Sequence, residues 1–149
     1  MRKFQTLSFI LALVLFAGCS LRPTDEDGRK AVEYKLNLGT SVPIKLISYS
    51  KVNGQIGATQ NKAGMSVESY SLEFEGIIEP ATNCALVPFK QNPEDFWIAS
   101  GDDDTLASFR TTDNALVMNS GTQYKIYGTV IFEKSEKGWE SERLIIKYP

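Results

Sequence analysis

The sequence contains no histidine among its 149 residues. This absence excludes Ser-His-Asp and Cys-His nucleophile systems, and it excludes zinc sites built on histidine. It also removes the commonest general base of enzymes. The sequence has no Gly-rich loop of the kind that cradles phosphate groups. Histidine-dependent nucleophile chemistry and phosphate binding by a Gly-rich loop are therefore not expected.

Cysteine is almost as scarce, because the chain has only Cys19 and Cys84. Two cysteines do not make the disulfide framework that staples small secreted domains. Cys84 has no partner within the chain if Cys19 is modified. We expect Cys84 to be a small buried hydrophobic residue, with a reactive thiol or an intermolecular bridge as the alternative.

The N-terminus has the three parts of a secretory signal. Arg2 and Lys3 supply the positive start, and a mostly apolar run of about 12 residues follows. This run is shorter than the roughly 20 residues that a membrane-spanning helix needs. The small pair Ala17-Gly18 then comes directly before Cys19. An ordinary secretory signal and an uncleaved membrane anchor are the alternative interpretations.

The ending at Cys19 resembles the lipobox of bacterial lipoproteins, in which a small residue precedes a cysteine that is lipidated. The resemblance implies that residues 1–18 are removed, that Cys19 carries fatty acids such as palmitate, and that residues 19–23 form a tether. Each buried CH₂ contributes about 0.8 kcal/mol, so several acyl chains give a nearly permanent attachment. Ser20, in the position after the cysteine, implies sorting to the outer membrane with the protein facing the periplasm.

The remaining chain, residues 24–149, has the length of a single domain and is long enough to bury a core. Removal of Arg2 and Lys3 with the signal takes the 16 basic residues to 14, against 18 acidic residues. A weakly acidic surface argues against nucleic acid as a partner. It also argues against a second, electrostatic contact with the membrane.

Helical spacing and end signals predict a helix over residues 24–39. Thr24 can cap its start, the acidic residues that follow suit the positive end of the helix dipole, and Gly39 is a natural stop. We expect its buried face to contain Ala31, Tyr34 and Leu38, with Val32 close to the same face. An alternating apolar pattern over residues 32–38 would permit a strand instead.

Alternating apolar residues predict four strands, which cover approximately 44–53, 70–78, 124–132 and 139–148. Asn53-Gly54 would end the first strand with a turn, and the polar stretch 55–66 would be a loop. The second strand has one apolar and one mostly acidic face, which is typical of an antiparallel strand that is wet on one side. The last two strands would form a hairpin, with Trp139 as a cross-strand aromatic residue.

The stretch 85–120 has no regular pattern and is expected to be an irregular insert, with short strands or turns at 106–109 and 115–118. The order of elements predicts an α+β fold, in which the N-terminal helix packs on a curved antiparallel sheet of about four to five strands. The hairpin 130–139 and the first two strands resemble those of small bacterial lipoproteins. Many of these proteins have a cystatin-like or NTF2-like α+β fold.

Two groups of carboxylates are candidates for chemistry. The first is the run Asp102, Asp103 and Asp104, which could bind Ca²⁺. Three consecutive side chains cannot all converge on one ion, so a solvated turn after Gly101 is the favoured interpretation. The second group is Glu73, Glu75 and Glu79, which could supply an acid–base pair in a pocket. They lie opposite the apolar face of their strand and are expected to be solvated.

The aromatic pair Phe96-Trp97 in the insert is the candidate contact for a partner or a ligand. Exposed aromatic residues supply much of the binding energy of protein surfaces. The alternative is that the pair folds back over the core. No metal or cofactor is expected.

Three functions are compatible with the sequence. The leading hypothesis is a membrane-anchored, non-enzymatic module that binds an envelope protein, an envelope polymer or a small ligand. The first alternative is a small-molecule enzyme or carrier that uses an NTF2-like pocket. The second is a structural envelope protein with no ligand site. The sequence leaves the oligomeric state open.

Overall fold

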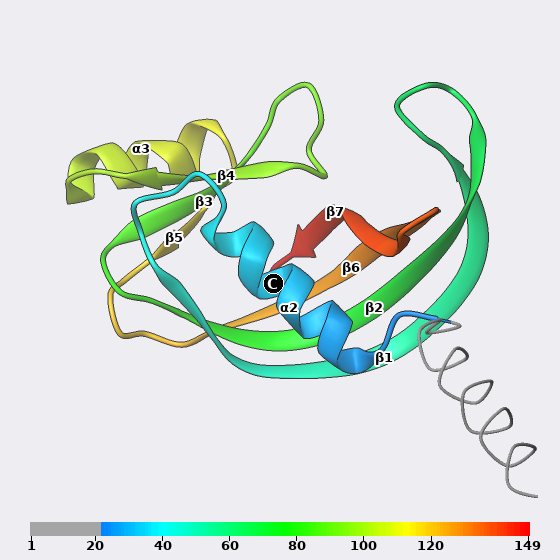
Figure 1. Cartoon of the computed structure of the whole chain (residues 1–149). Helices are drawn as coiled ribbons and strands as arrows, with labels where there is room; N and C mark the ends of the chain where they lie inside the picture. Colours follow the sequence, from blue (N-terminus) through cyan, green and yellow to red (C-terminus); the bar gives the residue numbers. More distant parts are fainter. Residues whose placement is uncertain (1–21) are drawn as a thin grey trace, which may run out of the picture.

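The computed structural model describes residues 22–149 (Figure 1). Within this range the chain forms two helices and seven strands, which assemble into two antiparallel sheets. The fold is therefore α+β, as predicted. The signal, the cleavage site and Cys19 lie outside the described residues, and what we expect of them stays a prediction.

Helix α2 (Asp25–Asn37) begins at a capping box. The Thr24 hydroxyl accepts a hydrogen bond from the Asp27 backbone N–H at 3.2 Å, and the Asp27 carboxylate accepts one from the Thr24 backbone N–H at 2.8 Å. The helix ends just before Gly39, whose φ of +70° suits glycine. The predicted helix and both of its end signals are confirmed.

The buried face of α2 differs from the predicted one. It contains Gly28, Ala31, Val32 and Leu36. The prediction is right for Ala31 but wrong for Tyr34 and Leu38, which are 61% and 56% exposed. Gly28 supplies the physical reason, because a Cβ at this position would lie only 2.1 Å from the hydroxyl oxygen of Tyr49. The missing side chain lets this face of the helix approach the sheet.

Four strands form the main sheet, in the order β1-β2-β6-β7. They are β1 (Ile44–Gln60), β2 (Ser66–Pro80), β6 (Tyr124–Ser135) and β7 (Gly138–Lys147). The sheet curves around α2, which lies on its concave side (Figure 1). The predicted apolar face of β2 is confirmed, since every second residue from Tyr70 to Ile78 is buried. The predicted C-terminal hairpin is confirmed as well, and Trp139 pairs with Lys134 across it.

Strand β1 continues past the predicted turn at Asn53-Gly54. Gly54 pairs with Leu72 of β2, and the turn of this hairpin comes later, around Asn61–Gly64. The predicted loop over 55–66 is therefore wrong for most of its length. Gly54 is needed for close approach, because a Cβ there would lie 2.1 Å from the hydroxyl oxygen of Tyr70. The Asn-Gly pair thus makes room for a cross-strand tyrosine.

The expected irregular insert is mostly regular structure. It contains β3 (Cys84–Pro88), β4 (Phe96–Ser100), α3 (Asp103–Thr112) and β5 (Leu116–Met118), and its strands form a sheet in the order β4-β3-β5. Residues 106–109 are helical, whereas the strand considered at 115–118 is present. Helix α3 begins here because the Asp102 carboxylate accepts a hydrogen bond from the Thr105 backbone N–H at 2.8 Å.

Strand β3 is buried on both faces and joins two cores. Cys84 and Leu86 belong to the main core with α2 and the main sheet, whereas Ala85 and Val87 belong to a smaller core under α3. The small sheet therefore lies between α3 and the main core. Cys84 is fully buried, as predicted, and burial raises the pKa of its thiol to about 11.

Candidate binding surfaces

Strand alternation sends the two residues of the predicted aromatic contact to opposite faces of β4. Phe96 is half-buried and packs against the main core. Trp97 is 40% exposed on the other face, where its ring lies edge-on to Phe109 of α3 with ring centroids 5.5 Å apart. Phe96 thus folds back over the core, whereas Trp97 is the exposed member of the pair. A role of Trp97 in partner or ligand contact stays a prediction.

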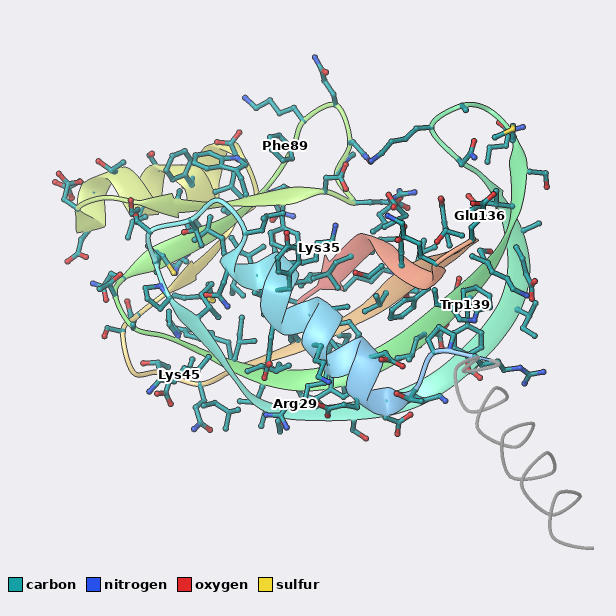
Figure 2. All side chains as sticks on the ribbon, in the orientation of Figure 1. Arg29, Lys35, Lys45, Phe89, Glu136 and Trp139 are labelled. Carbon is teal, nitrogen blue, oxygen red and sulfur yellow. The ribbon has the colours of Figure 1, made fainter. Side chains whose placement is uncertain are left out.

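Trp97 lies in a surface groove of about 490 Å³ at the small sheet, which we call the loop-side groove. Its walls come from β3, from the loop that follows it, from β4 and from the residue after α3. They comprise Val87, Pro88, Phe89, Lys90, Gln91, Asn92, Asp95, Trp97 and Asp113. Phe89 is 47% exposed and projects from the start of the loop (Figure 2). The groove therefore exposes two large aromatic side chains together.

The loop between β3 and β4 is held in place on both sides. Its ends are joined by a hydrogen bond from the Phe89 backbone N–H to the Asp95 carbonyl at 3.0 Å. Lys90 forms an ion pair with Asp113 at 3.2 Å, which connects the loop to the end of α3. On the other side, Glu94 forms an ion pair with Arg143 of β7. These contacts connect the loop that carries Phe89 to the end of α3 and to β7.

A second and larger groove, of about 800 Å³, lies between α2 and the tip of the β6–β7 hairpin. We call it the tether-side groove, because the described chain begins at its edge. Its walls comprise Pro23, Asp27, Lys30, Ala31, Tyr34, Phe132, Lys134, Ser135, Glu136, Lys137, Gly138, Trp139 and Ser141. Figure 2 shows Trp139 and Glu136 on this side of the molecule.

The tether-side groove is lined by aromatic residues and by charged residues of both signs. The Lys134 ammonium lies 5.7 Å from the centroid of the Trp139 ring and 2.8 Å from the Glu68 carboxylate. Asp27 lines the groove, but its carboxylate is engaged in the helix cap, where it also accepts a hydrogen bond from the Thr24 hydroxyl at 2.7 Å. Asp27 therefore has a structural role at the start of α2.

The acidic face of β2 is solvated, as expected. Glu75 forms an ion pair with Lys125 at 3.2 Å, and Glu79 accepts a hydrogen bond from Gln123 at 3.3 Å. Glu73 is exposed. These carboxylates lie on the convex side, away from both grooves.

The run Asp102–Asp104 begins α3 and does not form a free turn. Hydrogen bonds from the Thr105 side chain and backbone lower the pKa of Asp102. Among residues 22–149, no cluster of three or more histidine, cysteine, aspartate or glutamate side chains could hold a metal ion.

Of the residues that line the two grooves, the sequence singled out Trp97 as a candidate contact, but not Phe89 and not any residue of the tether-side groove. The signal for Phe89 was an aromatic residue directly after Pro88 in an otherwise polar stretch. The tether-side groove offered no local signal, because its walls come from residues 23–34 and 132–141. Only the fold brings these two segments together.

Comparisons with protein-family models, with curated proteins and with solved structures found no match. Neither helix of residues 22–149 is both long enough and apolar enough to cross a membrane.

Proposed function

We propose that this protein is a non-enzymatic binding module of the bacterial envelope, anchored to the outer membrane by lipid on Cys19 and facing the periplasm. The anchor is supported by the charged start, the short apolar run and the Ala-Gly-Cys ending of the first 19 residues. The partner would be an envelope protein or polymer, bound at the loop-side groove.

The observation that carries this proposal is the position of the exposed aromatic residues. Phe89 and Trp97 share one groove on the small sheet. The described chain begins at the other end of the molecule from α3 and this sheet (Figure 1). A chain held at its N-terminus would therefore present the loop-side groove away from the membrane. That is where a partner in the periplasm can reach it.

The bracing of the loop supports binding on energetic grounds. Association costs free energy whenever a mobile loop has to be ordered. The backbone hydrogen bond from Phe89 to Asp95 and the ion pairs at Lys90 and Glu94 each favour one conformation of this loop in the free protein. Aromatic side chains at the centre of an interface commonly contribute about 2 kcal/mol or more each. Two of them on a fixed backbone can support a specific contact.

The interior of the fold favours binding over catalysis in a sheet pocket. Helix α2 and the core residues around Leu72 and Phe74 occupy the concave side of the main sheet. An enzyme of the kind considered from the sequence would need an open pocket there, lined by a carboxylate. The lack of histidine in the chain points the same way.

We also infer a cystatin-like or NTF2-like architecture for the main sheet and α2. The support is that a helix is the first element of residues 22–149 and that an antiparallel sheet wraps around it. On this interpretation, the small sheet and α3 are an addition between the second and third strands of the shared framework.

The test places a photo-crosslinking amino acid at position 97 or 89 in intact cells, with position 47 as the control. Ile47 is 44% exposed, which is close to Phe89 and Trp97, and it lies outside the loop-side groove. We expect one discrete adduct from positions 97 and 89, and none from position 47. Equal adducts from all three positions, or none from any, would contradict the proposed contact surface.

A further inference from the structure

The tether-side groove lies where the chain enters the fold. Pro23 forms part of its wall, only four residues after Cys19. A fully extended chain of four residues spans at most about 14 Å. If Cys19 carries the lipid, which is the anchor proposed above, Pro23 and the edge of the groove beside it lie within that distance of the lipidated residue. The polar headgroup layer is about 5–8 Å thick on each side of a bilayer.

The side chains on the rim suit such a boundary. Tyr34 is 61% exposed, and Trp139 is half-buried with its ring edge-on to Tyr70. Tyrosine and tryptophan gather at the headgroup level of membranes, because their rings are apolar and their polar atoms can stay wet. Tyr34 does not contribute to the hydrophobic core, because its side chain is exposed and lines the groove.

Three lysines accompany these aromatic residues. Lys30 and Lys134 are paired with Glu26 and Glu68, whereas Lys137 makes no ion pair within residues 22–149. Lysine buries its carbon chain at an apolar boundary while its ammonium group meets lipid phosphates. The rim also carries Glu136, so its charge is mixed. Electrostatics alone would not bring this surface to a bilayer.

We propose that the rim of the tether-side groove rests in the phospholipid headgroup layer and fixes the orientation of the anchored domain. The lipid on Cys19 supplies a high effective concentration, so that a weak contact is enough. Trp139 and Tyr34 lie at the headgroups, and Lys137 meets their phosphates. The loop-side groove then points away from the membrane.

The two tryptophans of the chain make this orientation measurable. The lipidated full-length protein is reconstituted in vesicles of phosphatidylethanolamine and phosphatidylglycerol that carry a nitroxide quencher on the headgroup. The Trp97→Phe variant reports on Trp139, and the Trp139→Phe variant reports on Trp97. We expect the emission of Trp139 to be quenched at least twofold more than that of Trp97. Equal quenching, or stronger quenching of Trp97, overturns the proposal.

A charge reversal tests the lysine contribution. In the Trp97→Phe background, Lys137→Glu should reduce the quenching of Trp139, whereas Lys45→Glu on the far side should leave it unchanged (Figure 2). An equal effect of both substitutions contradicts a local contact at Lys137.

Vesicle flotation and the mass of the mature protein separate the two proposals. Protein that floats but shows equal quenching of both tryptophans overturns the headgroup contact and leaves the anchor standing. Protein that carries no lipid and does not float overturns the proposed anchor. The headgroup contact is then overturned as well, because it rests on that anchor.

Discussion

Tyr49 is the residue whose environment is hardest to reconcile with its chemistry. Its hydroxyl is buried and has no hydrogen-bond partner among the described residues. Burial, and then the charge of Asp25, raises the pKa of this hydroxyl. Its ring stacks on Phe74 with centroids 5.4 Å apart, and its tip meets the backbone of α2 at Gly28. The tyrosine thus acts mainly as a spacer between helix and sheet.

The contact between Gly28 and Tyr49 predicts a coupled pair of substitutions. Gly28→Ala should lower the free energy of unfolding by about 1–3 kcal/mol, because the new methyl group collides with the hydroxyl. Tyr49→Phe should be neutral or slightly stabilising, because it removes a buried hydroxyl that has no partner. In the double variant the loss should shrink, since the closest clash is gone. Urea unfolding measures all three, and strictly additive effects would argue against the contact.

Cys84 predicts a dependence of stability on alkaline pH. In the folded protein the pKa of its thiol is raised to about 11 from an ordinary value of 9.0. Between these values the unfolded chain binds fewer protons than the folded one, so the free energy of unfolding falls as pH rises. The slope should reach about 1.4 kcal/mol per pH unit for one group.

The Cys84→Ala variant isolates this effect. It should be less stable at neutral pH because of the small cavity, but it should lose less further stability between pH 9 and 11 than the natural protein. Chemical unfolding at several pH values gives both curves. Parallel curves would mean that Cys84 does not ionise differently in the two states.

At the scale of elements, the β1–β2 hairpin depends on one glycine. A Cβ at Gly54 would meet the Tyr70 hydroxyl at 2.1 Å, whereas a Cβ at Gly57 in the same strand would meet only Ser69 at 3.4 Å. Gly54→Ala should therefore cost about 1–3 kcal/mol. Gly57→Ala should be neutral or stabilising by up to about 1 kcal/mol, because alanine loses less freedom on folding. Thermal unfolding of the two variants distinguishes them, and equal stabilities would contradict the account.

The loop between β3 and β4 gives a prediction about binding. Glu94→Gln removes the ion pair with Arg143, and it should lower the cross-linking yield at position 97 because the loop becomes less ordered. Stability should change little, since exposed ion pairs contribute less than about 1 kcal/mol. Glu75→Gln, which removes an exposed pair with Lys125 on the main sheet, is the matched control. A similar loss of cross-linking yield in both variants would show that the ion pair between Glu94 and Arg143 has no specific role in binding.

Sequence signals predicted an element correctly where neighbouring residues determine its ends. They failed where contacts between residues far apart in the chain determine the structure. Thr24 and Gly39 define α2 because caps act within one turn of the helix. The turn predicted at Asn53-Gly54 was wrong, because Gly54 is needed for its close approach to Tyr70 on the neighbouring strand and not for a turn. Helix α3 was missed although its cap at Asp102 was visible, because its apolar positions Leu106 and Phe109 cover barely one turn.

On the scale of the whole molecule, the arrangement of two sheets could not be predicted from sequence. Strand β3 pairs with β4, the next strand in the chain, and also with β5, which follows α3, and its two faces serve different cores. The same limit applies to the sites. Trp97 could be named from its neighbourhood in the chain, whereas the groove around Trp139 needs α2 and the last hairpin to meet.

On the proposed function, the molecule as a whole has an anchor end and a recognition end. The tether-side groove includes Pro23, near the first described residue, whereas the loop-side groove is formed by the small sheet and the residue after α3. Helix α3 lies at the other end of the molecule from the start of the described chain (Figure 1). This separation gives a simple reason for two unlike surfaces on a small domain. One surface would settle the domain on the membrane, and the other would engage a partner in the periplasm.

The central claim is the lipid anchor at Cys19, and membrane fractionation of a Cys19→Ala variant tests it most directly. The natural protein should be found in the outer-membrane fraction, with a mature mass that begins at Cys19 and includes acyl chains. The variant should lose these chains and leave that fraction. Tight attachment of Cys19→Ala to the outer membrane, or a natural protein whose Cys19 carries no lipid, would contradict the account.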